Sequence, residues 1–150
     1  IYPEMSSDLS ANWLVRDSSD KPSNTSLIIN RTSRYQNPYL HYYFLKKYDD
    51  GRLAFVGTES EYENFCKKWE LDKVAYIKTL DFLEVSRYIC FAKGFLGNQS
   101  ACWHIADGLK IPRILEYSPH YPNTHPTGAD GYAAMYQEPL EYFVDKIMNG

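Results

Sequence analysis

Short apolar runs alternate with longer amphipathic segments along most of this chain of 150 residues. The apolar runs occur at residues 26–30, 53–56, 73–77, 95–96 and 112–116. Runs of this length, bounded by turn residues, are typical of strands that are buried on both faces of a sheet. The hydrophobic pattern therefore predicts about five strands.

Helical spacing fills the intervals between these runs, at residues 38–48, 59–69, 82–92, 100–109 and 139–148. Thr58 and Glu61 have the spacing of a capping box, in which two side chains satisfy N–H groups at a helix start. Asp81 and Glu84 repeat this pattern. Strands that alternate with helices predict an α/β fold: a Rossmann-like open parallel sheet with helices on both faces and right-handed crossovers.

The domain is expected to cover residues 27–150. Residues 1–26 are polar, with Pro3, Pro22 and many serines, and are expected to form a lead-in or linker segment. Within them, residues 9–15 predict one short helical turn that packs Trp13 on the domain. The first residue is Ile1 and not Met, which is compatible with a domain excised from a longer chain.

The stretch at residues 94–106 carries the strongest candidate chemistry. A short strand is followed by a turn at Gly97, Asn98 and Gln99, and a helix starts at about Ser100. Asn98 or Ser100 can cap this helix, whose spare N–H groups and dipole attract an anion. Gly97 would let the backbone approach such a ligand. A phosphate group is the expected ligand.

Ligands of open parallel sheets bind beyond the carboxyl ends of the strands. This rule predicts one rim of binding residues, each at or just after the end of a predicted strand. The candidates are Asn30, Arg31, Ser33, Arg34, Gly57, Thr58, Gly97, Asn98, Gln99, Ser100 and Glu116.

Composition narrows the function classes. The net charge of −3 argues against a general nucleic-acid binder, which needs a basic surface. The 14 tyrosines favour half-buried positions at edges, clefts or subunit contacts. Cys66, Cys90 and Cys102 have no paired spacing, so we expect buried free thiols and a cytoplasmic location. No stretch has the length and apolar character of a membrane span.

Several catalytic and metal sites are disfavoured. Asn98 and Cys102 occupy the positions around Ser100 where a hydrolase nucleophile elbow requires glycine. His120, His125 and Asp130 share a loop, but their spacing matches no compact zinc pattern, so no metal site is expected. Cys102 is interpreted as a structural thiol.

Two segments resemble the C-terminal half of GT-B glycosyltransferases, in particular the heptosyltransferase type (glycosyltransferase family 9). Residues 95–100 (Phe-Leu-Gly-Asn-Gln-Ser) and 105–116 (Ile-Ala-Asp-Gly-Leu-Lys-Ile-Pro-Arg-Ile-Leu-Glu) are similar to that family's Gly-x-x-Ser/Thr turn, Ala-x-x-Leu-x-x-Pro helix and following strand. Residues 57–61 (Gly-Thr-Glu-Ser-Glu) look like its Gly-x-x-x-Glu turn. The resemblance covers roughly residues 27–116.

The resemblance implies a donor-binding domain for a nucleotide-diphosphate sugar, with no required metal or other cofactor. Residues 97–100 would hold the diphosphate, Arg31 and Arg34 would lie near the phosphates, and Glu116 would accept from a ribose hydroxyl. Replacing Arg31 or Ser100 is then expected to weaken nucleotide binding with little change in thermal stability.

The sequence departs from the family in two ways. The family usually has an acidic residue where Asn98 or Gln99 stands, and a GT-B enzyme needs an N-terminal half that binds a glycan or other acceptor. The chain has no room for that half, so it is expected to bind the donor without turnover on its own.

Two other functions remain open. A non-catalytic binding or assembly module could keep the glycosyltransferase-like fold and use its tyrosine-rich surface, which strong oligomerisation without nucleotide affinity would favour. A small self-sufficient α/β enzyme could use the loop that holds His120, His125 and Asp130, which turnover by the isolated chain would reveal.

Overall fold

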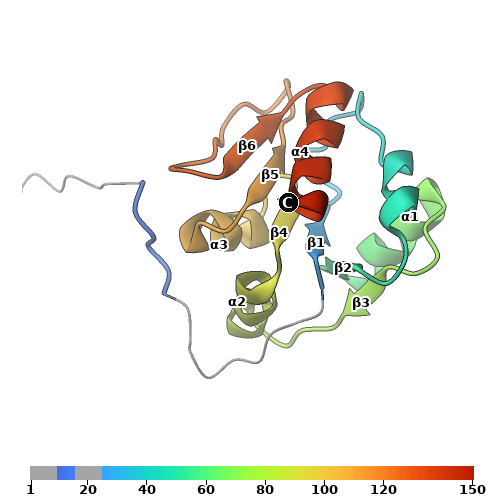
Figure 1. The fold of residues 1–150 in the computed structure, drawn as a ribbon, viewed down its shortest axis with the longest axis horizontal. Coiled ribbons are helices and arrows are strands. Elements are labelled where there is room, and N and C mark those ends of the chain that lie inside the picture. Colours follow the sequence, from blue (N-terminus) through green and yellow to red (C-terminus); the bar gives the residue numbers. More distant parts are fainter. Residues whose placement is uncertain (1–9, 16–24) are drawn as a thin grey trace, which may run out of the picture.

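A computed structural model describes residues 10–15 and 25–150, and within them it forms one six-stranded sheet (Figure 1). The strands are β1 (Leu27–Asn30), β2 (Leu53–Val56), β3 (Ala75–Ile77), β4 (Gly94–Gly97), β5 (Arg113–Glu116) and β6 (Gly131–Ala134). Their order is β3-β2-β1-β4-β5-β6, and every neighbouring pair is parallel. This is the strand order of the Rossmann fold. The predicted fold class, an open parallel α/β sheet, is confirmed.

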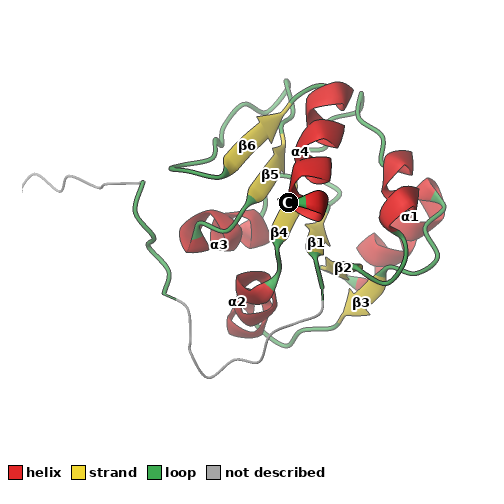
Figure 2. Cartoon of the chain, viewed as in Figure 1, coloured by secondary structure: helices red, strands yellow, loops and turns green. Residues whose placement is uncertain are grey.

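In the described part of the chain, four α-helices and one 3₁₀ helix pack around the sheet (Figure 2). They are η1 (Tyr43–Tyr48), α1 (Glu59–Trp69), α2 (Phe82–Phe91), α3 (Ala101–Leu109) and α4 (Gln137–Asn149). Successive strand residues face opposite sides, so Ile28 packs in one core with side chains of α2 and α3, while Leu27 and Ile29 pack in the other with those of η1, α1 and α4. Both faces of the sheet are therefore covered, as predicted.

The helix starts follow the sequence signals closely. Thr58 and Glu61 form the complete capping box of α1. Asp81 accepts from the backbone N–H of Glu84, and Ser100 accepts from that of Trp103. Each of these caps satisfies an N–H that has no partner within the helix.

Four details differ from the sequence predictions. Residues 38–42 are not helical, and the segment contains only η1. The strand β6 was not predicted, because Gly131 and two alanines leave little apolar pattern in its four residues. No helical turn forms at residues 10–15, although Trp13 does dock: its backbone N–H donates to the carbonyl of Gly108. Cys66 is only half-buried, whereas Cys90 and Cys102 are buried.

Most of the predicted lead-in segment lies outside the described residues.

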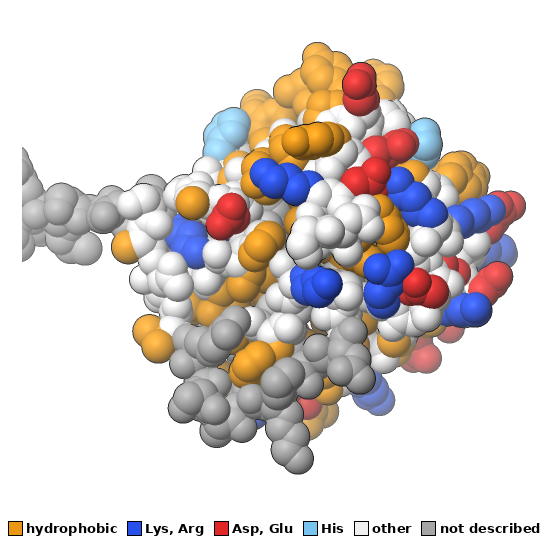
Figure 3. All heavy atoms as spheres, viewed as in Figure 1, with side chains coloured by type: hydrophobic (Ala, Val, Ile, Leu, Met, Phe, Trp, Pro, Cys, Tyr) orange, Lys and Arg blue, Asp and Glu red, His pale blue; other side chains and the backbone are white. Residues whose placement is uncertain are grey.

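On the face shown in Figure 3, the basic and acidic side chains of the described residues are interspersed. Within residues 10–15 and 25–150, no helix is long and apolar enough to cross a bilayer.

A buried ion pair fixes the loop that precedes β6. Arg113 is fully buried and donates to Asp107 of α3 (Nε to Oδ1, 2.7 Å) and to the carbonyls of Ile111 and Ala129. Asp107 also accepts from the backbone N–H of Thr127 at 3.0 Å. Burial alone would raise the pKa of Asp107, but the bonds from Thr127 and Arg113 outweigh burial and lower it.

Replacing Asp107 with Asn should destabilise the fold at pH 7 by about 3 kcal/mol, because it leaves the Arg113 guanidinium buried without a counter-charge. A carboxyl group whose pKa is lowered by folding stabilises the fold fully at pH values above its unfolded pKa of about 4. This contribution is lost as the pH falls through the pKa of the folded state. The difference in free energy of unfolding between wild type and Asp107→Asn should therefore shrink on acidification. Urea denaturation at pH 7 and at low pH measures both values.

Asp72→Asn is the matched control, because this aspartate lies on the surface. It should change stability little at either pH. A loss for Asp107→Asn that is equally large at both pH values would contradict the assigned charge role.

Candidate functional site

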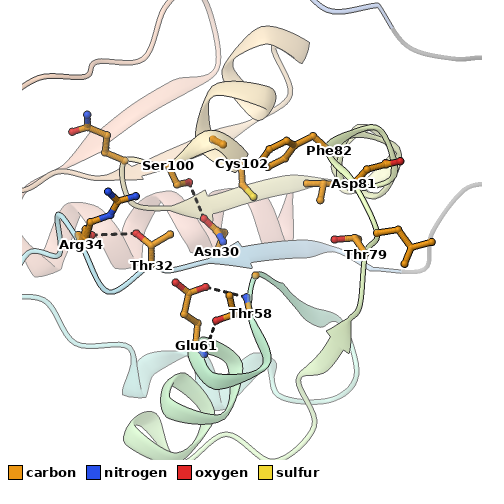
Figure 4. Close-up of a pocket in the computed structure, with 15 residues that line it drawn as sticks. Asn30, Thr32, Arg34, Thr58, Glu61, Thr79, Asp81, Phe82, Ser100 and Cys102 are labelled. Atoms are coloured by element: carbon orange, nitrogen blue, oxygen red, sulfur yellow. Dashed lines mark hydrogen bonds between the residues drawn. The ribbon is translucent and has the colours of Figure 1, made fainter.

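A cavity of about 430 Å³ opens at the carboxyl edge of the sheet (Figure 4). Its walls come from the segments that follow β1, β2, β3 and β4, and the strand order reverses direction between β1 and β4. Such a reversal is where open α/β sheets hold their ligands. The lining residues are Asn30, Thr32, Arg34, Gly57, Thr58, Glu61, Thr79, Leu80, Asp81, Phe82, Val85, Gln99, Ser100, Ala101 and Cys102.

Three helices start at this cavity. Thr58, Asp81 and Ser100, the N-cap residues of α1, α2 and α3, all line it. At α3, Ser100 takes the third N–H through its side chain and the fourth through its carbonyl. The first two N–H groups, of Ala101 and Cys102, have no partner within the helix. The positive ends of three helix dipoles therefore meet at one space, which favours an anionic ligand.

Two buried asparagines hold the strand ends that form the cavity. The Asn98 amide nitrogen donates to the carbonyls of Thr32 (3.0 Å) and Arg34 (2.6 Å), and its oxygen accepts from the Thr32 N–H (3.0 Å). Asn30 donates to the carbonyl of Val56 (2.8 Å) and accepts from the Ser100 hydroxyl (2.8 Å). These bonds connect the ends of β1, β2 and β4.

The Asn98 geometry explains one departure from the glycosyltransferase pattern. Asn98 is fully buried and uses both N–H groups of its amide on backbone carbonyls. A carboxylate is only an acceptor when ionised, so it could not make these two bonds. The residue thus shapes the loop at residues 32–34 and does not line the cavity.

Gly97 has a structural role in the sheet, whereas the sequence suggested that it would let the backbone approach a ligand. A Cβ at Gly97 would lie 2.6 Å from the carbonyl oxygen of Asn30 and 2.8 Å from the Phe95 ring. The glycine is needed where β4 pairs with β1, and the cavity does not include it. Gly57, with φ +147, does line the cavity, in a backbone conformation that favours glycine.

Arg31 and Glu116 form a buried ion pair outside the cavity. Arg31 donates through Nε (2.7 Å) and Nη2 (3.0 Å) to the two carboxylate oxygens of Glu116. Glu116 also accepts from the Tyr42 hydroxyl and from the backbone N–H of Asn37. Four donors fill the roughly four lone-pair positions of a carboxylate, so Glu116 has none left for a ribose hydroxyl.

This cluster shifts the pKa values of its members. Burial and then the adjacent Glu116 charge raise the pKa of the Tyr42 hydroxyl well above its ordinary value. Burial alone would lower the pKa of Arg31, but its hydrogen bond to Glu116 reverses the effect and raises it. Arg31 is thus a permanent cation whose charge is matched inside the protein.

The structure brings together six of the eleven sequence-predicted site residues, Asn30, Arg34, Gly57, Thr58, Gln99 and Ser100, around the cavity. Arg31 and Ser33 line a smaller neighbouring cavity, and Glu116 lines a narrow crevice. Gly97 and Asn98 lie beneath the loops. The binding role of all eleven stays a prediction.

The wall contributed by the segment after β3 was not predicted from the sequence. Thr79, Leu80 and Phe82 line the cavity, and the two apolar side chains are 89% and 61% exposed. Ligands of open sheets bind beyond the carboxyl ends of the strands, and this rule applied to β3 would have identified these three residues. The cavity consequently has a polar part beside α3 and an apolar part beside α2.

Charge and chemistry within the cavity are limited. Among the described residues that line the cavity, Arg34 is the one with a cationic side chain. Glu61 and Asp81 each accept from a backbone N–H in their helix caps. Burial raises the pKa of Cys102 to about 11, so its thiol is neutral and a poor nucleophile at pH 7. The described residues contain no group of three or more His, Cys, Asp or Glu side chains that could hold a metal ion.

Comparison with solved structures finds the same fold in two bacterial glycosyltransferases. The E. coli heptosyltransferase WaaC, with ADP-2-deoxy-2-fluoro heptose, superposes with a TM-score of 0.61 at 17% identity over 83% of this chain. The E. coli ADP-heptose LPS heptosyltransferase II superposes with a TM-score of 0.60 at 18% identity over 85% of it. No protein-family model and no curated protein sequence matches the chain.

The chain spans 44% and 46% of the lengths of these two proteins. The likeness shows a glycosyltransferase-like fold and supports the interpretation as a heptosyltransferase-like C-terminal half. At these identities it shows the fold alone.

Replacing Arg31 with Met should destabilise the fold by about 3–5 kcal/mol, because Glu116 is left as a buried carboxylate without its counter-charge. This corrects the expectation from the sequence that Arg31 can be changed with little effect on stability. Adding Glu116→Gln to the same chain should restore part of the loss. Arg34→Met, at an exposed position, is the control. A loss below about 1 kcal/mol by urea denaturation would contradict the assigned role.

Proposed function

We propose that this chain is the donor-binding half of a glycosyltransferase and holds a nucleotide-diphosphate sugar in the cavity at the ends of β1, β2 and β4. The observation that carries the proposal is the meeting of three helix N-termini at a 430 Å³ cavity, at the point where the strand order reverses. The fold shared with two heptosyltransferases supports it.

The diphosphate lies against the start of α3 in this proposal. The N–H groups of Ala101 and Cys102, which have no partner within the helix, donate to its oxygens, and Arg34 approaches from the loop after β1. An Arg guanidinium can give two parallel bonds to a phosphate. Stabilising the charge that develops on the leaving nucleoside diphosphate is the contribution of this half to sugar transfer.

The nucleoside lies toward α2. Leu80, Phe82 and Val85 offer an apolar wall for a planar base. Glu61 accepts through Oε2 in its capping box, which leaves Oε1 as a carboxylate acceptor for a ribose hydroxyl. It takes the place that the sequence analysis gave to Glu116.

The acceptor and the residues that deprotonate it belong to a further half in this proposal. Because the chain spans less than half of the two heptosyltransferases, we expect donor binding without turnover by the chain alone. We also propose a reducing, cytoplasmic environment, since all three cysteines are free thiols.

Arg34→Ala should weaken the binding of the preferred nucleoside diphosphate about tenfold, because a charge-assisted contact to phosphate is lost. Its melting temperature without ligand should be unchanged, since the side chain lies on the surface. Isothermal calorimetry with ADP, UDP, GDP and CDP, each with and without magnesium, measures the affinities.

Arg52→Ala is the matched control, because Arg52 immediately precedes β2 at the opposite edge of the sheet. It should bind as tightly as wild type. If the wild-type chain showed no measurable binding to any of the four nucleotides, this result would contradict the proposal and favour the non-catalytic assembly module.

Ala101→Asp should reduce nucleoside diphosphate affinity by roughly a hundredfold or more, because it places a like charge beside the diphosphate. Ala101 is exposed at the first position of α3, where a carboxylate favours the helix dipole by about 0.3–1 kcal/mol, so the fold should be kept or stabilised. Ala101→Asn, of the same size and without charge, should bind nearly as well as wild type. Equal affinity for the Asp and Asn variants would place the phosphates elsewhere.

Substitution of Ser100 is a less suitable test, because Ser100 also caps α3.

A further inference from the structure

A second cavity, of about 190 Å³, lies between the loop after β1 and helix α1. Most of its wall consists of side chains with N–H or O–H donors: Arg31, Ser33, Gln36, Asn64, Lys68 and Trp69. Glu61 is the one carboxylate among its lining residues and also lines the larger cavity. One of its oxygens already accepts the N–H of Thr58. The Gln36 amide already donates to the carbonyl of Thr32, so Lys68 and Nη1 of Arg31 are the charged donors that this wall offers.

Two cations of this wall adjoin the same indole. The Lys68 ammonium lies 4.8 Å and the Arg31 guanidinium carbon 5.9 Å from the ring centroid of Trp69. Arg31 is buried, and its pair with Glu116 uses Nε and Nη2, which leaves Nη1 outside that pair. The Arg31 charge is already matched by Glu116, so Lys68 is the cation that would attract an anion to this wall, with Nη1 of Arg31 as a further donor.

Trp69 supplies an independent observation. Its side chain is buried, and the indole N–H has no hydrogen-bond partner. A buried N–H without an acceptor is rare in native proteins and calls for an explanation such as a bound water or ion. Trp69 lines the second cavity, but its indole nitrogen exposes almost no surface there, so an acceptor reaches this N–H only after a small shift of the ring or its neighbours.

We propose that this second cavity binds a small oxyanion, a carboxylate or phosphate group. Liquid water occupies about 30 Å³ per molecule, so the cavity holds one such group with a few further atoms and is too small for a nucleotide. The site is separate from the proposed donor site, and apart from Glu61 the two share no lining residue. It can therefore be present whether or not the larger cavity binds nucleotides.

The indole signals of the three tryptophans give a direct test by proton–nitrogen correlation NMR. Trp69→Phe identifies the signal of Trp69. Inorganic phosphate and sodium acetate are each titrated to about 20 mM, with chloride exchanged so that the ionic strength stays constant. A saturable shift of the Trp69 signal is expected, without comparable shifts for Trp13 and Trp103. The anion with the lower dissociation constant identifies the site as one for phosphate or for carboxylate.

Lys68→Gln should weaken this binding roughly fivefold or more, because a charge-assisted contact is lost. Lys67→Gln is the matched control, since it removes the same charge from the preceding residue of α1, which does not line the cavity. Nucleoside diphosphate affinity, measured in parallel, should be the same in both variants, which separates this site from the donor site. No saturable shift with either anion, or equal weakening by the two substitutions, would overturn the proposal.

Discussion

The carboxyl edge of the sheet depends on two asparagine side chains that stand in for backbone partners. At the end of a parallel sheet the strands diverge into loops, and their last N–H and C=O groups lose the ladder. Asn98 satisfies three such groups of the loop after β1, and Asn30 connects Val56 with the cap residue Ser100. The cavity exists because these bonds hold three strand ends in place.

The anion binding proposed for this acidic protein relies mainly on helix N-termini, with Arg34 as the cation among the described residues that line the cavity. The buried pair of Arg31 and Glu116 lies in the same region, yet its charges are matched internally. It fixes the loop after β1 against β5, so Arg31 positions this edge of the sheet and does not reach the larger cavity.

Local signals were predictable from the sequence, and long-range pairing was not. The caps at Thr58 and Ser100 depend on residues three positions apart, and the strands on short apolar runs. The ion pair of Arg31 and Glu116 joins residues that are 85 positions apart. In the sequence, Arg31 and Arg34 look equivalent because they share one loop, and only the fold shows that Arg31 is buried. Asn98 and Ser100 were likewise equal candidates for the cap, and the fold decides between them because the Asn98 side chain bonds to the loop after β1. The edge strand β6 carries too weak a pattern to detect.

The central claim is that a nucleoside diphosphate lies across the start of α3, and backbone amide NMR tests it most directly. Titration of the labelled chain with ADP, UDP, GDP and CDP should shift the amide signals of Gln99, Ala101 and Cys102 most strongly for the nucleotide that binds. The amide of Leu53, at the opposite edge of the sheet, should stay unchanged. Shifts that gather away from the start of α3, or no saturable shift with any of the four nucleotides, would contradict the account.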